Sequence, residues 1–116
     1  MGAERRKFPR IPAAIAVAYR TVFLTDPNPT LSRDISEGGV RFFTMAPLDA
    51  GAVLKMSIQL PGKPQPVRLT AEVLWSRPVN PPSKEPGALP YETAVIFVDT
   101  TPADRQAIAS LVASRK

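Results

Sequence analysis

Residues 54–60 alternate strictly between apolar and polar side chains, and this pattern constrains the fold more than any other part of the sequence. Successive side chains of an extended chain point to opposite faces, so a period of two predicts a β-strand with one buried face. Proline and glycine at 61–64 then predict a turn, because proline presets one backbone angle and glycine tolerates positive φ. Further strands are expected from apolar runs at 13–24, 39–45, 67–75 and 93–98.

Two segments depart from the strand pattern. Five prolines lie from Pro78 to Pro90, and proline cannot donate to a sheet ladder, so this stretch predicts an exposed loop. Thr101, Pro102 and Asp104 form a helix-start pattern, with a hydroxyl cap, a proline at the first position and an acid near the positive end of the helix dipole. One C-terminal amphipathic helix is therefore expected.

The order of these segments predicts the fold class. It is a mainly β protein, a small antiparallel β-barrel of five to six strands with one C-terminal helix. The 116 residues form one domain by length. Trp75 continues the inward alternation of its strand, so it is predicted to lie in the core. We divide the chain into a flexible arginine arm at 1–12 and a single barrel domain with its helix at 13–116.

The composition excludes several classes of site. The sequence contains no cysteine and no histidine, so disulfides, zinc-finger ligand sets and a Ser-His-Asp triad are excluded, and no metal or cofactor is expected. An enzyme is not expected either, because a lone carboxylate without a nucleophile is no active site. No apolar run approaches the ~20 residues of a membrane span, and the start lacks the apolar segment of a signal peptide, so a cytoplasmic protein is expected.

The net charge of +5 is concentrated at the N-terminus. Four basic residues and one acidic residue in the first ten account for +3, and the rest of the chain is nearly balanced. This asymmetry favours a short cationic arm with one anionic ligand over a basic face that binds nucleic acid. A solvated tail that only aids solubility is the alternative that charge alone leaves open.

Two short motifs flank the first predicted strand. The first, R-x-x-x-R with a further arginine in front, and the second, D-x-S-x-x-G, are carried by Arg5, Arg6, Arg10, Asp34, Ser36 and Gly39. In this order and spacing they resemble the PilZ domain, and the resemblance covers most of the chain. It implies a bacterial receptor for the second messenger cyclic di-GMP, in motility or biofilm regulation. One position departs from the family pattern, because Ala94 stands where PilZ domains often have a glycine.

The resemblance assigns ligand contacts to the arginines. Arg6 and Arg10 would contact phosphate and guanine, and Arg5 would add to the grip. Arginine suits both parts of the ligand, since its planar guanidinium makes paired hydrogen bonds to phosphate oxygens or to the guanine O6 and N7 edge. Arg33 is placed near the site by its adjacency to Asp34. We expect the ligand to order the arm against the barrel and to present a new surface to a protein effector.

The second motif is interpreted as a polar turn that provides selectivity. Asp34 offers a carboxylate to the guanine N1 and N2 donors, and Ser36 can donate or accept through its hydroxyl. Gly38 and Gly39 permit a backbone geometry closed to other residues and leave room for a base. The alternative is ordinary turn chemistry, in which aspartate and serine side chains bond their own backbone.

Two other functions remain open from the sequence. A PilZ-type adaptor would act through protein contact without nucleotide binding, using the loop around Pro81-Pro82 or the terminal helix. A small oligonucleotide-binding barrel is disfavoured, because single-strand binders need aromatic stacking platforms along a basic groove. We therefore expect no nucleic acid polymer as a partner.

Overall fold

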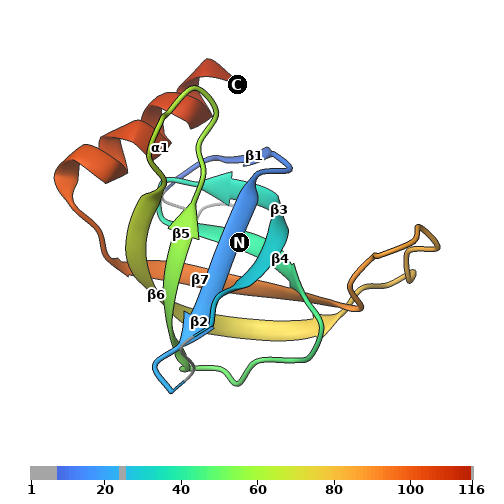
Figure 1. The fold of residues 1–116 in the computed structure, drawn as a ribbon. Helices are drawn as coiled ribbons and strands as arrows, with labels where there is room; N and C mark the ends of the chain where they lie inside the picture. The colour runs from blue at the N-terminus through green and yellow to red at the C-terminus, as the bar shows by residue number, and fades with distance from the viewer. Residues whose placement is uncertain (1–7, 24–25, 116) are drawn as a thin grey trace.

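The computed structural model describes residues 8–23 and 26–115, which fold into seven β-strands and one α-helix (Figure 1). The elements in chain order are β1 (Arg10–Pro12), β2 (Ala16–Thr21), β3 (Asn28–Ser36), β4 (Gly39–Thr44), β5 (Val53–Ile58), β6 (Val67–Pro78), β7 (Tyr91–Asp99) and α1 (Pro102–Ser114). The arm residues Arg5 and Arg6 lie outside the described residues.

The strands form a closed antiparallel barrel. They are hydrogen-bonded in the order β1-β3-β2-β5-β6-β7-β4, and every pair is antiparallel. Strand β3 also pairs with β4, so six strands close on themselves and β1 adds a short strand beside β3. The predicted small antiparallel barrel with one C-terminal helix is therefore confirmed.

Strands β1 and β2 pair with different parts of β3: β1 pairs with its C-terminal end and β2 with its N-terminal half. Between them the chain stays tied to β3, because Ala13 N donates to Arg33 O at 3.1 Å and Ser32 N donates to Ile15 O at 2.9 Å. The side chain of Ile11, in β1, is buried in the core. The sheet therefore begins at Arg10, within the segment that the sequence assigns to the flexible arm.

Strand β3 is not predicted by the sequence pattern. Prolines indicate a break at 26–30, yet Pro29 lies near the start of β3, where a proline is tolerated. Three polar residues of the strand are buried, namely Ser32, Asp34 and Ser36, and a β-bulge interrupts the pairing with β4 between Ser32 and Asp34. Buried polar residues and a bulge remove the alternation on which strand prediction depends.

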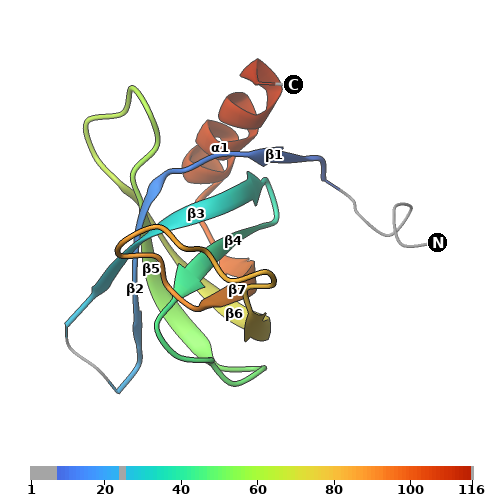
Figure 2. The same ribbon diagram turned by 90° about the vertical axis from the view of Figure 1, so that its right-hand side faces the viewer.

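Apolar side chains from the predicted strands and the helix fill the barrel. The alternating apolar residues of 54–60 and 67–73 are buried as expected. Helix α1 covers one end of the barrel (Figures 1 and 2), and its Ile108 and Val112 are buried in the core cluster. The helix begins with the predicted cap, because the Thr101 hydroxyl accepts a hydrogen bond from the backbone of the first turn at 3.1 Å.

The proline-rich loop joins β6 to β7 and projects from the barrel (Figure 1). Its residues 80–88 are exposed, as predicted. A hollow of about 490 Å³ lies between this loop and the outer surface of β3 and β4, and its lining includes Leu31, Phe43 and Leu89.

Candidate functional site

Arg10, the one residue of the arginine motif within the described part of the chain, meets the second motif on the barrel wall. Strands β1, β3 and β4 form this wall (Figure 2). Arg10 stands opposite Ser36 across β1 and β3, and Ser36 stands opposite Gly39 across β3 and β4. Asp34 lies two residues earlier on β3. Asp34 and Ser36 are thus strand residues, and the turn consists only of the two residues between Ser36 and Gly39. This corrects the interpretation of the whole motif as a turn.

Asp34 is the centre of an ion-pair cluster. Arg10 Nη1 lies 2.8 Å from Asp34 Oδ1. Arg41, on β4, donates from Nε to Oδ1 at 3.0 Å and to Oδ2 at 2.8 Å, and it donates from Nη2 to Oδ2. The structure therefore brings the motif residues Arg10 and Asp34 into contact and adds Arg41, which the sequence analysis missed.

The hairpin register explains the position of Arg41. Ser36 faces Gly39, so Asp34 faces Arg41 two residues further from the turn. Directly opposed residues of an antiparallel pair have neighbouring side chains on the same face. The two-residue turn was a signal that could have identified Arg41, but it is useful only once β3 is recognised as a strand.

The ion pair between Asp34 and Arg41 shifts the pKa values of both residues in the direction that keeps them charged. Burial by itself raises the pKa of Asp34, but hydrogen bonds and charge from Arg41, followed by Arg10, outweigh it and hold the pKa below the ordinary value of 3.8. The hydrogen bonds to Asp34 raise the pKa of Arg41 against the opposing effect of burial. Asp34 is therefore a carboxylate throughout the neutral pH range.

A second carboxylate extends the cluster. Glu92, on β7, is 2% exposed and pairs through Oε1 with Arg33 Nη1. Its Oε2 lies 3.8 Å from Arg41 Nη1 and has no hydrogen-bond partner among the described residues. Arg33 thus contacts Glu92 and not its sequence neighbour Asp34.

Ser36 and the adjacent glycines shape the hairpin turn. The buried Ser36 hydroxyl donates to Gly39 O at 3.3 Å and accepts from the backbone N of Gly38 and of Gly39, each at 3.2 Å. Neither glycine has a positive φ. A Cβ on Gly39 would collide with the carbonyl oxygen of Val95 on β7. Glycine therefore supplies space for close strand approach here, and not the special backbone geometry expected from the sequence.

The chain just before Arg10 lies across the same turn. The Phe8 ring rests against Gly38, where an added Cβ would be 2.8 Å from ring atom Cδ2. Arg105, on α1, has its guanidinium carbon 5.3 Å from the Phe8 ring centroid and its Nε 3.2 Å from Glu37 Oε1. These four residues help to line a hollow of about 270 Å³ beside the motif. The room over Gly38 that the sequence assigns to a ligand base is thus taken by Phe8 in this structure.

Trp75 is half-buried and lies outside the core cluster. A β-bulge between Val73 and Trp75 breaks the inward alternation of β6. Trp75 stands opposite Ala94, which in turn stands opposite Arg41, and the Arg77 guanidinium carbon lies 4.0 Å from the ring centroid. The prediction of a core tryptophan is therefore wrong. Trp75 instead lies two strands away from Arg41, at the same level of the sheet.

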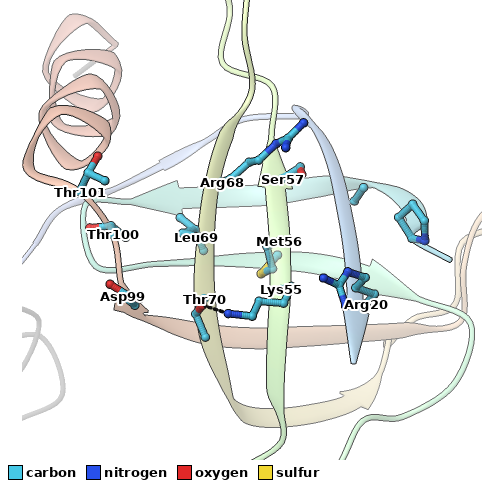
Figure 3. Close-up of a pocket in the computed structure, with 12 residues that line it drawn as sticks. Arg20, Lys55, Met56, Ser57, Arg68, Leu69, Thr70, Asp99, Thr100 and Thr101 are labelled. Atoms are coloured by element: carbon cyan, nitrogen blue, oxygen red, sulfur yellow. Dashed lines mark hydrogen bonds between the residues drawn. The ribbon is translucent and has the colours of Figure 1, made fainter. Parts of the chain in front are cut away.

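A separate hollow of about 430 Å³ lies on the wall of β2, β5 and β6 (Figure 3). Arg20, Lys55 and Arg68 lie around it, and Lys55 Nζ donates to Thr70 Oγ1 at 2.9 Å. It contains none of the motif residues. The site built by the two motifs is therefore distinct from this basic hollow.

Residues 8–23 and 26–115 include no helix that is long and apolar enough to cross a membrane. In the same ranges, no three or more His, Cys, Asp or Glu side chains lie together so that they could hold a metal ion.

Comparison with solved structures gives several similar folds. The PilZ domain of YcgR from Escherichia coli with c-di-GMP is 15% identical, with a TM-score of 0.73 over 96% of this chain and 91% of that chain. The Bacillus subtilis inhibitor of motility, MotI/DgrA, is 22% identical, with a TM-score of 0.75 over 96% of this chain and 50% of that chain. The K. pneumonia MrkH–c-di-GMP complex is 18% identical, with a TM-score of 0.75 over 95% and 51%. The chain thus spans about half the length of MotI and MrkH, and these likenesses show the fold alone.

Comparison of the sequence gives the family. No curated protein matches the chain. The family model of the PilZ domain matches residues 4–114, which include both motifs and all the strands and the helix described above. The chain therefore belongs to the PilZ domain family.

Proposed function

We propose that this chain is a non-enzymatic receptor for cyclic di-GMP. The observation that carries the proposal is the Arg10–Asp34–Arg41 cluster, in which one residue of each PilZ motif takes part. Support comes from the family match and from the YcgR and MrkH structures, which are c-di-GMP complexes with this fold. A ligand with two phosphates and two guanines suits clustered guanidinium groups, which bind both phosphate and the guanine edge.

The exposed part of the wall is cationic. The side chains of Arg10, Arg33 and Arg41 are between 21% and 55% exposed, whereas those of Asp34 and Glu92 are 9% and 3% exposed. An approaching phosphate therefore meets guanidinium groups before it meets a carboxylate. The arrangement favours a dianion, although the carboxylates of Asp34 and Glu92 offset two of the three positive charges.

Arg10 has the best-defined role in this proposal. Its strand β1 fixes the backbone, and the ion pair with Asp34 fixes the guanidinium, so little conformational entropy is lost when a phosphate or a guanine edge binds. Arg5 and Arg6 join from the arm. Ordering them costs on the order of 1–2 kcal/mol per residue for the backbone, which the charge-assisted contacts with the ligand must exceed.

The remaining motif residues support the site in different ways. Asp34 reads the N1 and N2 donors of guanine, and Ser36 and Gly39 hold the hairpin turn against β7. Trp75, in register with Arg41 through Ala94, offers a ring face near the cluster. Stacking on an aromatic ring is tolerant of base identity, so selectivity rests on Asp34 and the arginines.

We further propose that the ordered arm creates a surface for a protein effector. Phe8 already links the start of the described chain to Arg105 of α1, so an arm held by ligand would change the surface beside this helix. The alternative is an adaptor that binds a partner without nucleotide. The hollow beneath the proline-rich loop supports this second candidate, because Leu31 in its lining is 53% exposed and offers apolar surface to a partner.

Removal of the Arg10 guanidinium tests the proposed site. We expect micromolar or tighter binding of cyclic di-GMP by the unmodified protein and a loss of about ten- to a hundredfold for Arg10→Ala, because a charge-assisted contact contributes about 1.5–3 kcal/mol. The matched control is Arg68→Ala, which removes the same charge from the separate basic hollow on β2, β5 and β6. Equal affinity of all three folded proteins would reject the site.

A further inference from the structure

Asp34 has no free position with which to read guanine in this structure. Its carboxylate accepts four contacts from three N–H donors: one from Arg10 Nη1, one from Arg41 Nη2, and two from the single Arg41 Nε–H, which both oxygens share. A carboxylate offers about four lone-pair positions, and the Asp34 side chain is only 9% exposed. A guanine can therefore reach Asp34 only after at least one arginine has moved away.

Glu92 is a carboxylate with spare capacity within reach of the same arginine. It is buried, and Oε2 has no hydrogen-bond partner among the described residues. A buried charged oxygen without a partner is costly and uncommon, so it calls for an explanation. Arg33 satisfies only the other oxygen of Glu92.

Arg41 lies between the two carboxylates. Its Nε and Nη2 edge faces Asp34, and its remaining Nη1 is 3.8 Å from Glu92 Oε2. That separation is just outside hydrogen-bond range. A small rotation of the guanidinium would exchange contacts with one carboxylate for contacts with the other.

We propose that Glu92 is a positioning residue that receives Arg41 when cyclic di-GMP binds, and thereby releases Asp34 to accept hydrogen bonds from guanine. The inference rests on the proposed function of the site. The exchange keeps Arg41 paired with a carboxylate in both states, so neither state leaves its buried charge unpaired. Arg10 stays paired with Asp34 Oδ1 and so remains positioned for the ligand, while the vacant Glu92 oxygen gains a donor.

Affinities measured for both cyclic di-GMP and cyclic di-AMP distinguish this role of Glu92 from a purely structural one. Glu92→Gln removes the charge that would receive Arg41, so we expect cyclic di-GMP affinity to fall about tenfold, the scale of one charge-assisted hydrogen bond. Cyclic di-AMP does not use the released Asp34 and should keep its affinity, so the preference for guanine falls by the same factor. Glu85→Gln, which removes one negative charge from the exposed loop, should leave both affinities unchanged.

A double-mutant cycle tests the coupling to Arg41. In an Arg41→Gln background there is no arginine to exchange, so adding Glu92→Gln should change cyclic di-GMP affinity by less than about twofold, a departure from additivity that signals direct coupling. A readout that needs no variant is the Nε–Hε NMR signal of Arg41 in the unmodified protein. It should shift when cyclic di-GMP is added, because Nε leaves Asp34.

The outcomes distinguish this inference from the proposed function. If the unmodified protein does not bind cyclic di-GMP, the proposed function fails and the inference fails with it. If the protein binds but Glu92→Gln weakens both nucleotides equally, weakens neither, or acts identically with and without Arg41, the exchange is overturned while the receptor function stands. An Arg41 signal unmoved by ligand overturns the exchange even if Glu92→Gln does not fold.

Discussion

Asp34 connects three strands through one side chain. Its backbone lies in β3, and its carboxylate binds Arg10 of β1 and Arg41 of β4. Removing one member of such a nearly buried group leaves the others uncompensated, which is strongly destabilising. The residue therefore contributes both to barrel stability and to the organisation of the site.

Acid should destabilise the protein through Asp34. The pKa of this carboxyl is lower in the folded protein than its ordinary value of 3.8, so the unfolded state binds the proton at higher pH. The stabilisation from Asp34 is then present above about pH 4 and is lost as the pH falls toward the folded pKa. Thermal unfolding between about pH 5 and pH 3 should show a steeper fall in Tm for the unmodified protein than for Asp34→Asn. Parallel declines would assign the acid sensitivity to other groups.

Two neighbouring glycines should differ in their tolerance of a methyl group. Gly39→Ala would press its Cβ against the backbone carbonyl of Val95, whereas Gly38→Ala would meet the Phe8 side chain. Overpacking against fixed backbone costs about 1–3 kcal/mol, and a side-chain ring near the chain start can shift more easily. Urea unfolding should therefore show a larger loss of stability for Gly39→Ala. The reverse order would contradict the close approach of β4 to β7.

At the scale of elements, regular alternation made some strands predictable and its absence hid another. β5 and β6 follow their apolar pattern and are buried on the expected face up to Val73. β3 carries buried Ser32, Asp34 and Ser36, and these residues are polar because they bond neighbouring backbone and side chains. The motif that identifies the site thus also conceals the strand that holds it.

The proline-rich loop should be dispensable for both folding and nucleotide binding. The β6–β7 ladder continues to Pro78 opposite Tyr91, and Val79 N donates to Pro90 O at 2.9 Å, so the strands are joined before the exposed segment begins. Replacing residues 80–87 with a short turn should leave Tm and cyclic di-GMP affinity nearly unchanged, as measured by calorimetry. Loss of nucleotide binding in a folded deletion variant would place the loop in the site.

At the scale of the whole molecule, the fold class was predictable but the composition of the site was only partly so. Alternation, turn residues and a helix cap predict a barrel with a terminal helix. Arg41 reaches Asp34 through the local register of the β3–β4 hairpin, but Glu92 joins them only because β4 also pairs with β7, which closes the barrel. That closure depends on contacts between distant parts of the chain, which no local pattern encodes.

Salt should weaken nucleotide binding without removing its selectivity. The net charge is +5, and phosphate attraction to partly exposed arginines is screened at higher ionic strength, with a Debye length of about 10 Å at 0.1 M. Hydrogen bonds to the guanine edge carry the choice of base. Titrations at low and high salt should therefore show falling affinity for both cyclic dinucleotides with a nearly constant ratio between them. A ratio that collapses with salt would assign selectivity to charge alone.

The most direct test of the receptor function is a calorimetric titration of the unmodified protein with cyclic di-GMP, with cyclic di-AMP as the comparison. The Arg10–Asp34–Arg41 cluster predicts saturable binding of cyclic di-GMP at micromolar or lower concentration and clearly weaker binding of cyclic di-AMP. Absence of binding, or equal affinity for the two nucleotides, would contradict the assignment of this PilZ wall as a guanine-reading site.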